Sequence, residues 1–258
     1  MSEYNASVAK HLKKLIPRDD PYLRVHHTRY ARTLSVLLDQ KPFAGKLLEV
    51  GTSSIIPIIL KLIVPKLDIH VTEYNLDKPA VGTKTIQLLE YVRSVPVYRV
   101  NLETTPLPVE DETFDYVLCS EVLEHMEQDP MFMLAELNRV LKPGGVLVLT
   151  TPNIASSSGV SRMLKGIDPY FYMQYRKAGT LDRHNYEYTV FSLSNVLHSA
   201  GFDGSAWTED VFSVPASLPV LGLMALGFPM NHLGDSIFSV SKKVGPVVDR
   251  YPSIIYSD

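Results

Sequence analysis

Short apolar runs alternate with segments of helical period along residues 46–151. Runs of this length, rich in Val, Leu and Ile, are typical of strands that are buried on both faces of a parallel sheet. The segments between them place apolar residues at helical spacing, so the pattern predicts a βαβ series. The predicted strands cover residues 46–50, 68–73, 97–100, 114–119 and 146–151, and the predicted helices cover residues 53–65, 81–92 and 121–141.

Further elements flank this series. Residues 22–40 have the period of an amphipathic helix, residues 190–199 predict a helix, and residues 206–214 and 236–242 predict antiparallel edge strands. We therefore expect an α/β fold with a mostly parallel sheet and an antiparallel C-terminal edge. The expected organisation is one domain over residues 1–258, with an N-terminal helical segment (1–43), a core (44–152) and two cap insertions (153–188 and 213–235) that cover one crevice.

Composition narrows the function classes. The chain has 258 residues, is 45% hydrophobic and 21% charged, and carries a net charge of -3 with no window of clustered Lys and Arg. Long RNA or DNA is therefore not an expected partner, because binding a phosphate backbone needs such clusters. The single cysteine, Cys119, excludes an intramolecular disulfide and is expected to be buried in its strand.

The chain's apolar segments bear on its location. The first residues contain no apolar run of the kind that secretory signals need, so we expect a cytoplasmic protein. Residues 211–234 lack Lys, Arg, Asp and Glu, but Pro215, Pro219 and Pro229 argue against a membrane-spanning helix. Two interpretations remain for this segment: a buried apolar lid over an active site, which we favour, or a surface loop that contacts a membrane or a lipid carrier.

A short motif after the fourth predicted strand carries candidate chemistry. In FDYVLCSEVLEH, Glu121, Glu124 and His125 are spaced i, i+3, i+4, which places them on one face of a helix. Two carboxylates and an imidazole that converge are suited to a divalent metal or to proton transfer. The alternative is that the acids only favour the helix dipole and that the histidine is a surface residue.

The order of these signals resembles the class I S-adenosylmethionine-dependent methyltransferases. The stretch LLEVGTSS is similar to their first motif, and LPVEDETFDYVLCSEVLEHM and LNRVLKPGGVLVLTTPN are similar to their fourth and fifth strand motifs. The resemblance covers roughly residues 44–210 and implies a Rossmann-like, seven-stranded sheet whose core binds S-adenosylmethionine. Ser53 and Ser54 stand where the family usually has further glycines. The cofactor-binding residues that the resemblance implies are Glu49, Gly51, Thr52, Ser53, Glu73, Tyr74, Asn101, Leu102 and Ser120.

A narrower likeness concerns the motif after the fourth strand. The E-x-x-E-H string, the TPN after the fifth strand and His184 in RHNYEYT resemble the small-RNA 3′-terminal ribose 2′-O-methyltransferases, and catechol O-methyltransferases of the ubiquinone pathway share the helix motif. The resemblance implies that Glu121, Glu124, His125 and His184 hold Mg²⁺ or Mn²⁺. It implies catalytic roles for Glu121, His125 and His184, with His125 or His184 as a metal-independent general base in the competing interpretation.

The acceptor is inferred from the cap sequences. The stretches TPNIASSSGVSRMLKG and GDSIFSVSKK look like those of methyltransferases associated with polysaccharide and glycolipid assembly. The resemblance implies O-methylation of a hydroxyl on a sugar or another vicinal diol, so the expected partner is a small-molecule or glycan acceptor. Two alternatives are a 3′-terminal ribose of RNA and a cofactor-binding subunit without turnover. The oligomeric state stays open.

Overall fold

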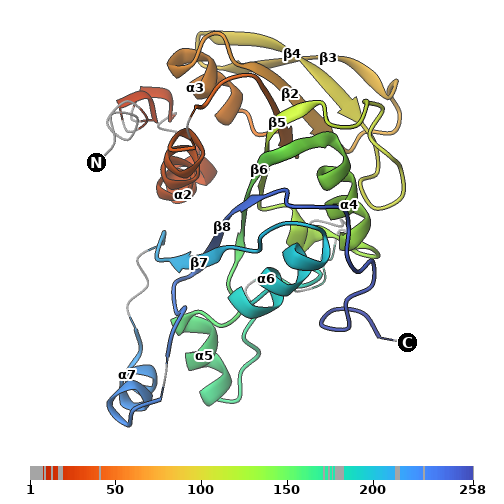
Figure 1. Cartoon of the computed structure of the whole chain (residues 1–258). Coiled ribbons are helices and arrows are strands. Elements are labelled where there is room, and N and C mark those ends of the chain that lie inside the picture. Colours follow the sequence, from red (N-terminus) through yellow and green to blue (C-terminus); the bar gives the residue numbers. More distant parts are fainter. Residues whose placement is uncertain are drawn as a thin grey trace.

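An eight-stranded sheet forms the centre of the computed structural model (Figure 1). The structure describes residues 8, 10–12, 14–16, 20–40, 42–170, 172–173, 175, 177, 183–212, 216–228 and 230–257. The strands lie in the order β3-β4-β2-β1-β5-β6-β8-β7. Their bounds are β1 (Lys46–Val50), β2 (Asp68–Glu73), β3 (Val81–Leu88), β4 (Tyr91–Arg99), β5 (Phe114–Ser120), β6 (Leu141–Pro152), β7 (Ala206–Glu209) and β8 (Ser236–Lys242).

The pairing of these strands confirms the expected fold class. Strand β1 lies between β2 and β5 and pairs with both in parallel, and the pairs β2–β4 and β5–β6 are also parallel. The pairs β6–β8 and β7–β8 are antiparallel and form the expected C-terminal edge. The sheet has eight strands rather than seven, because β3 adds an antiparallel strand at the other edge.

The predicted helix over residues 81–92 is wrong, since these residues form strand β3 and the start of β4. Strand β3 pairs with β4 along its whole length, and the two are joined by a turn at Leu89 and Glu90 in which Leu89 has a φ of 52°. The segment contains the β-branched residues Val81, Thr83 and Thr85 in alternation, and all three are exposed or half-buried. This period of two favours a strand over a helix.

Helices cover both faces of the sheet (Figure 1). Helices α2 (Pro21–Leu38) and α3 (Ile56–Ile63) pack on one face, and α4 (Pro130–Val140) and α6 (Val190–Ser199) pack on the other. Their starts follow local rules: Asp20 and Asp129 accept hydrogen bonds from backbone N–H groups in the first turns of α2 and α4, and Thr189 forms a capping box at α6.

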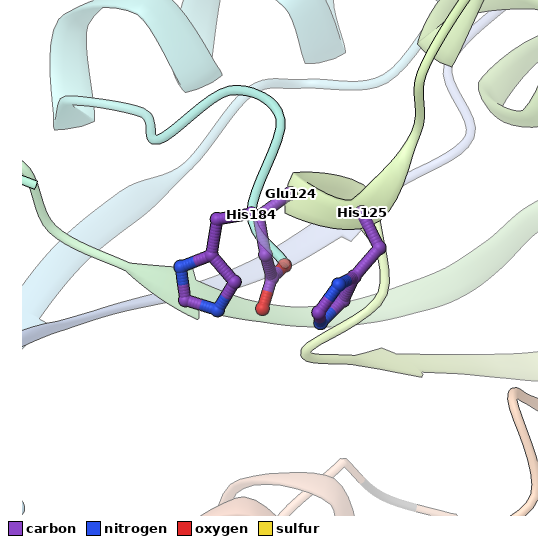
Figure 2. A group of neighbouring side chains, drawn as sticks. All are labelled: Glu124, His125 and His184. Atoms are coloured by element: carbon purple, nitrogen blue, oxygen red, sulfur yellow. The ribbon is translucent and has the colours of Figure 1, made fainter. Parts of the chain in front are cut away.

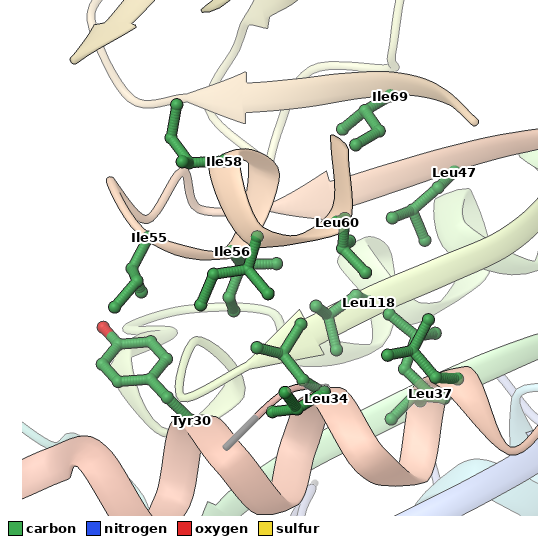
Figure 3. Packing of buried hydrophobic residues seen from close by; sticks show 14 of the residues in the cluster. Tyr30, Leu34, Leu37, Leu47, Ile55, Ile56, Ile58, Leu60, Ile69 and Leu118 are labelled. Atoms are coloured by element: carbon green, nitrogen blue, oxygen red, sulfur yellow. The ribbon is translucent and has the colours of Figure 1, made fainter. Parts of the chain in front are cut away.

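One face of the sheet is sealed by aliphatic side chains (Figure 3). Helices α2 and α3 interdigitate there with strands β1, β2 and β5, and a buried side chain of this kind stabilises the fold by about 1.5–3 kcal/mol. Cys119 is buried as expected, and burial raises the pKa of its thiol. Figure 3 labels Tyr30, Leu34, Leu37, Leu47, Ile55, Ile56, Ile58, Leu60, Ile69 and Leu118.

The segment after β5 departs from the predicted helix over residues 121–141. Glu121 has a φ of 56°, and the chain then forms a single 3₁₀ turn, η1 (Leu123–His125), before α4 begins at Pro130. Pro130 cannot lie inside a helix and Asp129 caps the helix that follows it, so the chain breaks here. The helical face expected for Glu121, Glu124 and His125 is therefore wrong.

The two insertions contribute helices α5 (Ser157–Leu164) and α7 (Leu218–Ala225), which contact each other and project beyond the β7–β8 edge (Figure 1). In α7 only Val220 is buried, so the buried lid expected of residues 211–234 is wrong for this helix. Among the helices of the described residues, none combines the length and the apolar character that crossing a bilayer requires.

Candidate active site

Two cavities adjoin at the carboxyl ends of β1 and β5, the edge at which open α/β sheets bind ligands. The smaller has a volume of about 370 Å³ and the larger a volume of about 530 Å³. Tyr22, Arg29 and Glu121 line both. A ligand in one cavity is therefore placed next to a ligand in the other.

The turn after β1 shapes the smaller cavity. Gly51 has a φ of 67°, and a Cβ atom there would lie 2.9 Å from Cγ2 of Val122, so a side chain is excluded for two reasons. Thr72 of β2 holds the turn, because its Oγ1 accepts a hydrogen bond from Gly51 N (2.9 Å) and its carbonyl accepts one from Thr52 N (3.1 Å). Five of the expected cofactor-binding residues line this cavity: Glu49, Gly51, Thr52, Ser53 and Ser120.

Glu49 lines the smaller cavity, and only one of its two carboxyl oxygens accepts hydrogen bonds from the described residues. Its Oε1 accepts from Ser53 Oγ at 2.7 Å, whereas its buried Oε2 has no hydrogen-bond partner among the described residues. Burial raises the pKa of Glu49 to about 8. Ser53 Oγ also accepts from the backbone N–H of Ile56 at 3.1 Å, so this serine links Glu49 to the start of α3. A cationic ligand group would satisfy the orphaned oxygen.

The other expected cofactor residues lie outside this cavity's lining. Glu73 stands at the end of β2 as predicted, but its carboxylate binds Lys84 Nζ (2.6 Å) and Arg99 Nε (3.0 Å). The hydrogen bond from Lys84 is the main cause that lowers the pKa of Glu73. Lys84 comes from the β3–β4 hairpin that the sequence interpretation missed. Tyr74 is exposed, Asn101 accepts a hydrogen bond from Glu103 N, and Leu102 packs against the core.

Three of the four expected metal ligands converge in the larger cavity (Figure 2). One possible ligand atom each from Glu124, His125 and His184 lies within 4.8 Å of the other two. Glu124 and His125 belong to η1, and His184 belongs to the first insertion. Asn185 joins the two segments, because its backbone N–H donates to Glu124 O (2.7 Å) and its side-chain amide donates to His125 O (2.9 Å).

The hydrogen bonds of the two histidines fix which nitrogen faces the cluster. His125 Nδ1 lies 2.9 Å from the carbonyl oxygen of Arg183, which only accepts, so Nδ1 carries the proton. His184 Nδ1 lies 2.7 Å from the fully buried carboxylate of Glu187. In the neutral tautomers these contacts favour, Nε2 of each ring holds the lone pair. A carboxylate or carbonyl on the second ring nitrogen is typical of histidines that bind metals.

Glu124 completes the cluster with a buried carboxyl group. Its Oε2 accepts from Thr151 Oγ1 at 3.0 Å, and its buried Oε1 has no hydrogen-bond partner among the described residues. Burial raises the pKa of Glu124 well above its usual value, and the negative charge of Glu121 adds to this effect. The donor set fits a divalent cation, because a positive charge at this point would compensate both the burial and the orphaned oxygen.

The structure places the fourth expected ligand, Glu121, outside this cluster. Its Oε2 accepts from Arg29 Nη1 at 2.7 Å and its Oε1 accepts from Thr150 Oγ1 at 2.9 Å. The positive φ of Glu121 turns the backbone so that its side chain leaves the direction of Glu124 and meets α2. Arg29 is only 6% exposed, so its guanidinium depends on this pairing.

Helix α2 also lines the larger cavity. His26 lines it, and its ring centroid lies 4.2 Å from that of Tyr22 and 5.4 Å from that of Phe212. His26 is half-buried, whereas His27, the next residue along α2, is exposed. Burial lowers the pKa of His26. The remaining lining includes Tyr172 and Ser158 of the first insertion.

Comparisons with known proteins show similarity to methyltransferases. Residues 50–149 match the model of a methyltransferase domain. A probable S-adenosylmethionine-dependent methyltransferase of Mycolicibacterium smegmatis is 33% identical over 121 residues, which are 46% of this chain and 38% of that protein. The ubiquinone biosynthesis O-methyltransferase of Cereibacter sphaeroides is 29% identical over 123 residues, 43% of this chain and 48% of that protein. The chain thus spans about half, or less, of the length of these curated relatives.

A solved structure agrees over a longer stretch. A S-adenosylmethionine-dependent methyltransferase from Archaeoglobus fulgidus superimposes with a TM-score of 0.54 at 16% identity, covering 87% of this chain and 100% of that one. Identity at this level shows the fold alone. The chain therefore has the fold of the S-adenosylmethionine-dependent methyltransferases, and its residues 50–149 are similar to a methyltransferase domain.

Proposed function

We propose that the protein is a S-adenosylmethionine-dependent O-methyltransferase that acts on a hydroxyl of a sugar or another vicinal diol, assisted by a divalent cation. One observation carries the proposal: the two cavities share Tyr22, Arg29 and Glu121. One cavity offers a glycine turn and an acid, and the other offers a cluster of metal-ligand type. A methyl donor in the first would lie beside a hydroxyl in the second, as group transfer requires.

In this proposal the smaller cavity binds the amino-acid part of the methyl donor. Gly51 lets the ligand approach the backbone, and the buried Glu49 pairs with the α-ammonium group through Oε2. Serine at position 53 does not impair the turn, because Ser53 Oγ ties Glu49 to the start of α3. Glu73, in the position expected for the ribose acid, stays a prediction, since the ribose hydroxyls would have to share its carboxylate with Lys84 and Arg99.

In the larger cavity, Glu124, His125 and His184 would hold the cation through one carboxylate oxygen and two Nε2 atoms. A divalent cation supplies charge that lowers the pKa of an acceptor hydroxyl and fixes the orientation of a diol. Glu187 orients His184, and Asn185, the next residue along the chain, donates a hydrogen bond to the carbonyl oxygen of His125. Tyr22 and Phe212 give apolar ring faces on which a sugar can stack.

The reaction is a displacement at the methyl carbon. The acceptor oxygen forms a bond to this carbon while the bond from carbon to sulfur breaks, and its electron pair stays on sulfur, so that the sulfonium becomes a thioether. The hydroxyl proton passes to Glu121, the carboxylate that lines both cavities, and from there to water. Among the relatives, the one named as an O-methyltransferase supports transfer to oxygen.

The proposal is tested by metal binding and turnover measured together. Mn²⁺ titration followed by electron paramagnetic resonance should show a site in the wild type that His184→Ala and Glu124→Gln remove. Glu187→Gln should weaken Mn²⁺ binding by about 10–100-fold, because an outer partner tunes a ligating histidine. The matched control is His198→Ala, since His198 is an exposed histidine on α6. Turnover is followed as S-adenosylhomocysteine formed with a panel of sugars, catechols and nucleosides.

The outcomes separate the competing interpretations. Chelator should abolish turnover, and Mg²⁺ or Mn²⁺ should restore it. Full turnover in excess chelator, lost in His125→Gln, would assign a general base and reject the cation. Binding of S-adenosylhomocysteine without turnover on any acceptor of the panel would favour a cofactor-binding subunit. Absence of S-adenosylhomocysteine binding would reject the proposal as a whole.

A further inference from the structure

Helices α5 and α7 form an apolar projection, which we call the α5–α7 spur and define as residues 157–167 and 216–228. The two helices contact each other and extend beyond the sheet edge at β7 and β8, at the opposite end of the molecule from β3 and β4 (Figure 1). Large exposed apolar side chains gather on the spur: Met163, Leu164, Ile167, Leu218, Leu221, Met224, Leu226 and Phe228. Such clustering is unusual on a protein surface and marks a binding surface.

The distribution around α7 indicates what covers it. The helix LPVLGLMA carries no charged side chain, and Val220 is its single buried residue. The large exposed side chains of the helix, Leu218, Leu221 and Met224, are spaced i, i+3, i+6, so they form one apolar face that the rest of the protein leaves uncovered. A short helix with an apolar face of this kind can lie flat in the surface layer of a membrane. At eight residues α7 is too short to cross a bilayer, so it can only enter the surface layer.

The charged residues beside α7 are complementary to a negatively charged lipid surface. Residues 157–167 contain Arg162 and Lys165 and no acidic residue, and residues 216–228 contain no charged residue at all. The chain as a whole has a net charge of -3, so the spur is locally positive on a negative protein. Basic residues beside an exposed apolar helix are typical of segments that lie on anionic membranes.

The spur also adjoins the larger cavity. Ser158 at the start of α5 lines it, and so do Phe212 and Asp235, which stand on either side of the segment that contains α7. Asp235 accepts hydrogen bonds from the backbone N–H groups of Val211 and Phe212, at 3.0 and 2.8 Å, and so closes this segment at its base. A surface that holds the spur would therefore hold the cavity close to the same surface.

We propose that the α5–α7 spur inserts into the interfacial layer of an anionic membrane. It would bring the larger cavity to an acceptor carried by that membrane, and this second part rests on the proposed function. Binding of the spur itself does not depend on methyl transfer. The cations and the apolar side chains contribute separately: about fivefold in affinity is expected for each basic residue near an anionic surface.

The test uses vesicles of phosphatidylcholine alone and vesicles that also contain phosphatidylglycerol, with binding measured by flotation. Wild-type protein should float with the anionic vesicles and bind them about 25-fold more tightly than the neutral ones, as expected for Arg162 and Lys165 together. Lys165→Gln should reduce this preference about fivefold. Leu221→Asp combined with Leu226→Asp should abolish binding to both vesicle types. Val248→Asp is the control, since Val248 is 71% exposed and lies outside the spur.

Binding of S-adenosylhomocysteine, measured on each variant, should stay unchanged and shows that the variants are folded. No flotation of the wild type overturns the proposal, and so does equal flotation of the Leu221→Asp/Leu226→Asp variant. Sedimentation that shows a wild-type dimer, converted to a monomer by the same double variant and without vesicle binding, would assign the spur to a second copy of the chain instead. Flotation without turnover on any acceptor would reject the proposed function and leave the membrane surface standing.

Discussion

Glu49 provides a test of the ligand contact proposed for the smaller cavity, because one substitution should raise the stability of the protein and lower its affinity for the ligand. The carboxyl group is fully buried, and its Oε2 has no hydrogen-bond partner among the described residues. Glu49→Gln keeps the shape and the acceptor oxygen for Ser53 but cannot ionise. We expect the variant to be more stable than the wild type at alkaline pH and to bind S-adenosylhomocysteine less tightly.

The magnitude follows from the pKa. Burial raises the pKa of Glu49 to about 8, from a usual value of 4.5, so the folded state keeps a proton over this pH window that the unfolded state has released. The free energy of unfolding therefore falls as the pH rises through the window, by about 1.4 kcal/mol for each pH unit. Between about pH 5 and pH 8 the free energy of unfolding of the wild type should fall by roughly 4 kcal/mol because of Glu49, and this contribution should be absent in Glu49→Gln.

The assay is urea denaturation of both proteins at several pH values. The difference between their free energies of unfolding at each pH cancels the contributions of all other titrating groups. The exposed Glu90 on the β3–β4 turn offers the control, and Glu90→Gln should show no pH-dependent difference from the wild type. By calorimetry, S-adenosylhomocysteine should bind Glu49→Gln with about 1.5–3 kcal/mol less free energy, the usual contribution of a hydrogen bond to a charged group. A stability difference independent of pH would refute the burial argument, and unchanged affinity would refute the assigned ligand contact.

Two further predictions concern the residues between the cavities. Arg29→Met should lower the free energy of unfolding by about 1.5–3 kcal/mol in urea denaturation, because it leaves the half-buried carboxylate of Glu121 without its charged hydrogen-bond donor. Arg29→Met with Glu121→Gln should recover most of this loss, and no recovery would show that Arg29 acts through packing. Gly51→Ala should lower the free energy of unfolding more than Gly144→Ala does, because Gly144 has a similar φ of 71° but no atom within 4 Å of the added methyl group. Equal losses would show that the close approach to Val122 adds nothing to the backbone strain of about 1–2 kcal/mol.

The sequence predicted the strands of the parallel sheet well, since burial on both faces gives each of them a continuous apolar run. It failed on residues 81–92, where an exposed edge strand has no such run. Val81 and Leu88 of β3 have a spacing that also fits a helix, although the alternating β-branched residues Val81, Thr83 and Thr85 favour a strand. The consequence for function is direct, because this hairpin carries Lys84 to the carboxylate of Glu73.

The sequence also predicted that Glu124 and His125 converge, but for a reason that the structure corrects. Glu124 and His125 converge because η1 is a single turn pinned by Asn185, rather than because they share the face of a long helix. The pairing with His184 came from a resemblance, and the structure brings His184 into the same cluster. No local pattern predicts such a contact, since it depends on how the first insertion folds back onto η1.

Glu121 and Glu124 differ in whether the protein supplies a positive charge beside the carboxylate. Burial raises the pKa of Glu124, and the negative charge of Glu121 adds to this effect. Arg29, 92 residues away in the chain, neutralises Glu121, whereas Glu124 keeps an oxygen without a hydrogen-bond partner among the described residues. One acid therefore has its cation built into α2, and under the proposed function the other would bind a cation from solution. Because Arg29 and Glu121 line both cavities, the same ion pair fixes α2 against the place where methyl donor and acceptor would meet.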